Sequence, residues 1–142
     1  MVVYGFNDDK SKHDLSGTGN IRHIKKLTSS DNVLELNKAD FREQYTSILV
    51  AFVAIETWGS NLQYAMRETA VVPLAFINGQ IDSNPNTNQG QCNLALIDAG
   101  ATLGSVQFDS FSNDKWLLNF TVGSSVTNPS TVHASIYGIR KA

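Results

Sequence analysis

The sequence predicts a mainly β chain of the α+β kind: an antiparallel β-sandwich or jelly-roll-like head preceded by an extended N-terminal arm and one apolar helix. Three observations predict this. From residue 62 onward, apolar side chains recur mostly at every second position, which is the period of a strand with one buried face. Turn-forming residues interrupt this pattern at short intervals. Before residue 62, a polar segment is followed by a long apolar one.

Length and charge limit the classes of protein to consider. The chain has 142 residues, which favours a single domain with its own core. Charged residues make up 17% and the net charge is −2. Low charge is typical of a surface that is partly hidden in an assembly, and an acidic balance argues against nucleic-acid binding.

The sequence also bears on redox chemistry and targeting. A single cysteine, Cys92, excludes an intramolecular disulfide framework and a cysteine-based zinc site. The N-terminus lacks a basic region followed by an apolar one, so we expect no signal peptide and synthesis in a cytoplasm. The longest apolar run, Ile48 to Ile55, is far shorter than the roughly 20 residues of a membrane span, so we expect no membrane insertion.

Residues 1–30 are predicted to form the arm, because their apolar and polar positions follow no period. Apolar side chains outside the main core need cover, and packing onto a neighbouring protein would provide it. The residues expected to attach the arm are Tyr4, Phe6, Ile21 and Ile24.

Residues 31–142 are predicted to form one domain, with a helix at about 38–57 and a β head at about 62–142. Apolar residues in the helical segment recur at steps of four, three, four and three, as on the seam of a helix that self-associates. The seam residues are Phe41, Tyr45, Ile48, Phe52 and Ile55. Asn37 or Asp40 would supply the N-cap oxygen.

A central strand is the alternative for residues 45–57. Ile48, Val50, Val53 and Ile55 are β-branched, which favours a strand, and a continuous apolar run also fits a strand buried on both faces. The periodic segment is longer than ordinary strands of roughly 3–10 residues, so a helix is preferred. A helical seam would indicate self-association, whereas a central strand would leave the monomer self-sufficient.

The β head contains several short strands in order. Residues 62–66 alternate first, and Asn78-Gly79 is a hairpin signal. Further alternating segments cover residues 92–97, 106–111, 116–122 and 132–139. Polar loops separate them at 82–90 and 124–131.

No pattern for catalysis, metal binding or a cofactor occurs, so we expect no enzyme, no metal and no cofactor. His13, His23 and His133 are far apart, without acidic or cysteine neighbours at metal-ligand spacing. No Gly-x-Ser-x-Gly motif is present.

The two polar loops give the one hint of a ligand. Their neutral Asn, Gln, Ser and Thr side chains offer donors and acceptors for sugar hydroxyls, and an aromatic ring would supply an apolar face. The candidate ligand-binding residues are Trp116, Tyr137, Asn86, Asn88 and Asn128. Solvated turns and core aromatics are the simpler interpretation of the same residues.

The two ends of the chain resemble small phage and prophage structural proteins. The resemblance rests on residues 3–12, where Tyr4-Gly5-Phe6 precedes an Asn/Asp/Lys/Ser stretch, and on residues 136–140. It implies a non-enzymatic virion component, such as a fibre, baseplate or decoration protein, and usually a homotrimer. The arm would then bind other virion proteins, and the head would face a host-surface glycan. The alternative is a stand-alone carbohydrate-binding β-sandwich module.

Overall fold

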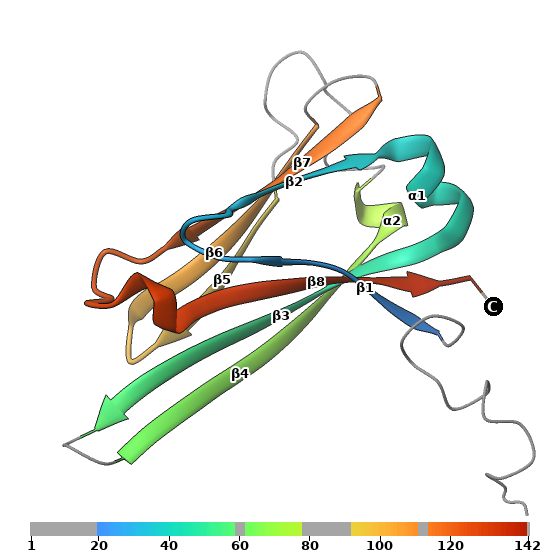
Figure 1. Ribbon diagram of the computed structural model, residues 1–142. Helices are drawn as coiled ribbons and strands as arrows, with labels where there is room; N and C mark the ends of the chain where they lie inside the picture. The colour runs from blue at the N-terminus through green and yellow to red at the C-terminus, as the bar shows by residue number, and fades with distance from the viewer. Residues whose placement is uncertain (1–19, 59–61, 78–91, 111–113, 142) are drawn as a thin grey trace, which may run out of the picture.

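The computed structural model describes residues 20–58, 62–77, 92–110 and 114–141. They are mainly antiparallel β, in two four-stranded sheets with short helical segments (Figure 1). The elements are β1 Ile21–Leu27, β2 Val33–Asn37, α1 Lys38–Gln44, β3 Tyr45–Trp58, β4 Leu62–Pro73, α2 Leu74–Phe76, β5 Cys92–Asp98, β6 Ala101–Ser110, β7 Lys115–Val122, the 3₁₀ turn η3 Pro129–Thr131 and β8 Val132–Arg140. Neither α1 nor α2 has the length and apolar content that a membrane-spanning helix needs.

The strand order places the first and last described strands side by side. One sheet has the order β1-β8-β3-β4 and the other β2-β7-β6-β5. The chain therefore changes sheet four times, between β1 and β2, β2 and β3, β4 and β5, and β7 and β8, while β5, β6 and β7 follow one another in one sheet. The backbone N–H of Arg140 donates to the carbonyl of Asn20 at 2.7 Å, so the β1–β8 pairing extends to the start of the described chain. Residues 21–27, which were predicted to belong to the arm, are therefore a strand of this sheet.

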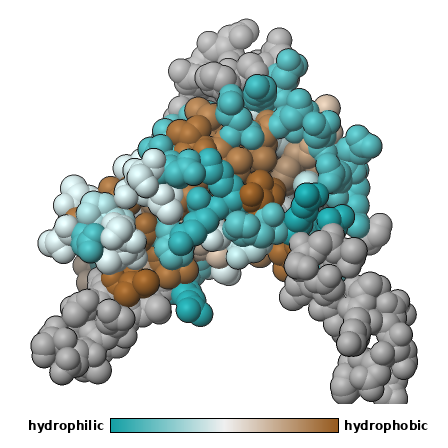
Figure 2. Space-filling model, in the orientation of Figure 1, coloured by the Kyte–Doolittle hydropathy of each residue, from teal (hydrophilic) through white to brown (hydrophobic). Residues whose placement is uncertain are grey.

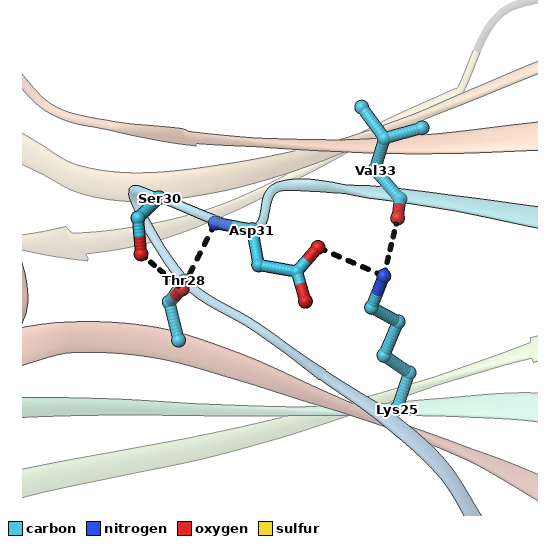
Figure 3. A network of polar contacts seen from close by, with 5 residues as sticks. All are labelled: Lys25, Thr28, Ser30, Asp31 and Val33. Carbon is cyan, nitrogen blue, oxygen red and sulfur yellow. Dashed lines mark hydrogen bonds and ion pairs between the residues drawn. The ribbon is translucent and has the colours of Figure 1, made fainter.

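A polar network fixes the crossing from β1 to β2 (Figure 3). The ammonium group of Lys25 donates to the carbonyl of Val33 at 2.9 Å and lies 2.9 Å from the carboxylate of Asp31. The backbone N–H of Asp31 donates to the Thr28 hydroxyl, which also contacts the Ser30 hydroxyl. These contacts hold the turn that carries the chain from one sheet to the other.

The predicted helix at 38–57 is wrong beyond its first two turns. Helix α1 begins after Asn37, whose side-chain oxygen accepts from the N–H of Asp40 at 3.0 Å, and ends at Gln44. Tyr45 is extended, and β3 continues from there to Trp58. The strand pairs with β8 on one side and β4 on the other, so its backbone groups are satisfied across the sheet. Its β-branched residues also suit a strand better than a helix.

The predicted self-association seam is largely inside the molecule. Phe41, Tyr45, Ile48 and Phe52 are at most 5% exposed and belong to the core of their own chain. Side chains buried in this way cannot form a seam between copies. Of the five predicted seam residues, only Ile55 reaches the surface, with 38% of its area exposed.

Side chains from both sheets form one core. Its largest fully buried members are Trp116, Phe108 and Phe120, all from the β2-β7-β6-β5 sheet. The Trp116 ring meets the edge of Phe41 at a centroid distance of 6.1 Å, and the Arg42 guanidinium lies 5.0 Å from its centre. At the surface, hydrophobic patches remain between hydrophilic residues (Figure 2).

Gly138 gives a test of the packing between β8 and the end of α1. A Cβ at this position would lie 2.6 Å from the Tyr45 ring, whereas Gly138 allows the ring to lie against the β8 backbone. We expect Gly138→Ala to lower the free energy of unfolding by about 1–3 kcal/mol, because the ring and backbone must move apart. Urea denaturation measures the change.

Ser135→Ala is the control on the same strand. Ser135 is half-buried on the face of β8 that points away from the core, so its substitution should change the free energy of unfolding by less than about 0.5 kcal/mol. Equal losses in the two variants would contradict the packing assigned to Gly138.

Candidate functional site

A cavity of about 310 Å³ lies where the loop between β7 and β8 meets β3 and β6. It is near the lower end of the size range of small-molecule sites, roughly 300–1,000 Å³. The lining residues are Ala54, Ile55, Leu103, Ser125, Val126, Thr127, Asn128, Thr131 and Val132. The cavity is thus formed by segments that lie far apart in the sequence.

Gly123 anchors the first end of the loop. Its N–H donates to the carbonyl of Leu103 at 2.8 Å, and its own carbonyl accepts from the N–H of Val126 at 3.1 Å. A Cβ on Gly123 would lie 1.8 Å from the carbonyl oxygen of Thr102. No residue with a side chain fits so close to the backbone of β6, so glycine is required for the loop to begin here.

Asn128 anchors the second end. Its side-chain oxygen accepts from the backbone N–H of Ser130 at 3.3 Å and from the Ser130 hydroxyl at 2.8 Å. The Thr131 hydroxyl donates to the Asn128 carbonyl at 2.7 Å. These bonds cap η3, which leads directly into β8. The Asn128 side chain therefore has a structural role in the turn that forms the cavity wall.

The cavity offers neutral hydrogen-bonding groups and apolar contacts. Among the described residues, the hydroxyls of Ser125 and Thr127 and the side-chain nitrogen of Asn128 have no hydrogen-bond partner. Ile55, Leu103 and Val126 supply apolar walls. No lining side chain titrates near neutral pH, so these residues can recognise a neutral polar molecule by hydrogen bonding.

The structure does not bring the predicted ligand-binding residues together. Asn128 lines the cavity, whereas Tyr137 lies on the outer face of the β1-β8-β3-β4 sheet, with the His23 ring edge-on at 5.1 Å. Trp116 is 1% exposed, so its prediction as a stacking partner is wrong. Asn86 and Asn88 fall outside the described residues.

The predicted attachment residues are also divided. Ile24 packs against the core, and Ile21 lies half-buried on β1 opposite Ile139. Both residues thus belong to the sheet. Tyr4 and Phe6 fall outside the described residues.

Sequence reasoning identified the polar loop at 124–131 but missed its partners. Ala54 and Ile55 line the cavity because β3 extends past the start of β8, and Leu103 lines it from β6. No local signal marks these three residues, since only the strand order brings them to the loop.

A second cavity, of about 280 Å³, lies between β1, β2 and α1. Its lining mixes charged, neutral polar, aromatic and aliphatic side chains: Arg22, His23, Ile24, Glu35, Leu36, Asn37, Asp40, Phe41, Gln44 and Tyr45. Glu35 has Lys115 at 3.9 Å, and the Asn37 oxygen is used by the α1 cap. Within the described part of the chain, no three His, Cys, Asp or Glu side chains are placed to hold a metal ion.

His133 gives a pH-dependent test of the outer sheet face. Partial burial, together with the nearby positive charge of Lys26, holds the pKa of His133 below its ordinary value of 6.5. Between these two pKa values the unfolded chain binds more protons than the folded chain, so the contribution of His133 to stability is lost as the pH falls below 6.5.

We therefore compare the native chain with His133→Gln across a pH range of about 7.5 to 5. The free energy of unfolding of the native chain, minus that of the variant, should decrease as the pH falls. The carboxylates are the same in both proteins, so their contribution to the pH dependence cancels in this difference. A difference that stays constant or increases toward acidic pH would contradict the lowered pKa.

Comparisons with known proteins give no indication of the function of this chain. No protein-family model matches the sequence, and neither a curated protein nor a solved structure matches it. Any functional proposal therefore rests on the geometry of the sheets and cavities and on the resemblance at the two ends of the chain.

Proposed function

We propose that the chain is a non-enzymatic structural protein of a virus particle, a homotrimeric fibre, baseplate or decoration component with a glycan-binding head. It is made in the host cytoplasm and acts in the virion. The resemblance of residues 3–12 and 136–140 to phage structural proteins supports the virion part. The second of these segments belongs to β8, which pairs with both β1 and β3.

The neutral cavity is the observation that carries the binding part. Sugar hydroxyls both donate and accept hydrogen bonds, and Ser125, Thr127 and Asn128 offer matching groups. Ile55 and Val126 offer apolar walls for the C–H faces of a sugar ring. None of the lining residues is aromatic, so a single site binds weakly. Several copies in one particle then provide avidity.

The jelly-roll type is part of the proposal. In its favour, β1 pairs with β8 in one sheet and β2 with β7 in the other, which is how the outer strands of a jelly roll are wound. The inner strands depart from that order, because β3 and β4 pair within one sheet and β6 lies between β5 and β7.

Residues 1–19, with Tyr4 and Phe6, are proposed to attach the head to other virion proteins.

A stand-alone carbohydrate-binding module is the second candidate, favoured by the same cavity. It differs from the first in predicting no association with particles. The two tests below separate the two proposals.

Glycan binding is tested with Thr127→Val, which removes one hydroxyl of the cavity and nearly conserves the shape of the side chain. On a glycan array and then by titration with the glycan it identifies, affinity should fall about 2- to 12-fold, the effect of one hydrogen bond. Thr121→Val is the control, since Thr121 is exposed on β7 outside the cavity. If no glycan binds the native chain, or if the two variants behave alike, the cavity is not a receptor site.

Virion membership is tested by mass spectrometry of particles purified on a density gradient from the culture that produces the protein. The chain should be present at a fixed ratio to the major capsid protein, because structural proteins occupy equivalent positions. Its absence from particles, with glycan binding intact, would favour the stand-alone module.

A further inference from the structure

The outer face of the β1-β8-β3-β4 sheet carries an apolar patch centred on β3, and polar residues such as His133, Ser135 and Thr69 are paired beside it. Directly paired residues on neighbouring strands point to the same side of a sheet. Leu49 on β3 pairs with Tyr137 on β8 and with Val71 on β4, and Ile21 on β1 pairs with Ile139 on β8. We call this set the outer apolar face: Ile21, Leu49, Ala51, Val53, Val71, Tyr137 and Ile139.

This face points away from the core of its own chain. The alternate residues of β3, among them Ile48, Val50 and Phe52, are at most 2% exposed and fill the core. Leu49, Ala51 and Val53 point the opposite way and are half-buried, and Val71 is 52% exposed. Among the described residues, no strand or helix is stacked on this face (Figure 1).

The sequence of β3 is that of a strand covered on both sides. An antiparallel sheet with one face in water normally alternates apolar and polar residues, whereas a strand buried on both faces is a continuous apolar run. Ile48 to Ile55 is such a run, and so large an apolar face marks an interaction site.

We propose that the outer apolar face is the contact surface for a second copy of the chain, which packs the same face against it. The proposal goes beyond the proposed homotrimer, because a face that packs on its own copy joins chains in pairs and does not close a three-fold ring. It replaces the predicted helical seam, four of whose residues lie in the core. A self-complementary contact of this kind has a two-fold axis.

The size of the face suits another sheet of the same kind. Ser47 to Ile55 spans about 26 Å along β3, and four strands span about 19 Å, or about 500 Å² in projection. Side chains corrugate this area, which brings its accessible surface toward the roughly 600–800 Å² per partner of specific interfaces. A single bound peptide strand would cover only about a quarter of that width.

The distribution of charge also fits an interface. The segments of β3 and β8 that face outward contain no Asp, Glu, Lys or Arg between residues 47–55 and 131–139. The charges lie on the two edge strands, Lys26 on β1 and Arg67 on β4, where both residues are exposed. An apolar centre with a charged rim is the usual anatomy of a protein interface.

The basic rim predicts an unusual dependence on salt. Two copies bring rim charges of the same sign together, so screening should leave the association unchanged or strengthen it between about 0.05 and 0.5 M NaCl. An acidic macromolecule on the same face would be released by salt instead.

Analytical ultracentrifugation of the full chain tests the proposal with two matched variants. Val71→Lys places a charge within the outer apolar face, whereas Ile97→Lys places one at a 59% exposed position on the other sheet. The native chain should associate at about 10 µM. Val71→Lys should raise the dissociation constant by at least about 30-fold, because it places an unpaired charge against the apolar face of the second copy, and Ile97→Lys by less than about 3-fold.

Folding is controlled separately. Val71 and Thr69 are exposed on the edge strand β4, so lysine at either position should leave the circular dichroism spectrum of the monomer unchanged. Thr69→Lys should also weaken association, since Thr69 pairs with Ala51 within the face.

Three results would overturn the proposal. They are a native chain that stays monomeric at about 100 µM, variants at 69 and 71 that associate like the native chain, and an association that weakens steadily with salt. The virion proposal is judged separately, by the presence of the chain in purified particles. A monomer that is found in particles would thus refute this interface and leave the virion role standing.

Discussion

The two-sided pairing of β3 is the constraint on which the rest of the structure depends. This strand hydrogen-bonds to β4 from Ser47 onward and to β8 as far as Ala54. Pairing on both sides satisfies the backbone groups of the most apolar segment of the chain. It also fixes the register. Because side chains alternate across a strand, a shift of one residue would move Ile48, Val50 and Phe52 out of the core and turn their neighbours into it.

The position of the candidate cavity follows from this register. β8 starts opposite Ala54, so β3 extends beyond it by several residues, and Ile55 becomes accessible at that end. The loop that leads from β7 to β8 must cross between the sheets at the same place. Gly123 attaches it to β6, and the Asn128 cap turns it into β8. A neutral, hydroxyl-lined cavity therefore forms where the crossing loop passes over the end of β3. This end pairs with β4 but extends beyond the start of β8.

Periodicity predicted the strands well where apolar and polar residues alternate, and the helix poorly where every residue is apolar. The segments at 92–97, 116–122 and 132–139 lie within β5, β7 and β8. In the run from Ile48 to Ile55, any period can be read, and the usual length limit for strands wrongly favoured a helix.

Asn37 was correctly named as a possible cap, because capping is a local property. Trp116 was wrongly predicted to bind a ligand. Alternation shows which residues share one face of a strand, but it does not show whether the opposite sheet of the sandwich covers that face. The same limit hid Leu103 and Ala54 from the predicted site, since two separate strands, β6 and β3, place them beside the loop.

The apolar run in β3 was open to two explanations, cover by the rest of the chain or cover by other copies. The register divides the run into two sets of residues. The residues at even positions from 48 to 54 are covered by the second sheet, and the residues at odd positions face outward beside Tyr137 and Val71. A strand that had only to complete a monomer would be expected to carry polar residues at those odd positions. Leu49, Ala51 and Val53 stand there instead, and the proposed contact with a second copy would account for them. The fold and the proposed contact between copies thus use opposite faces of one strand, and a change in its register would disturb both.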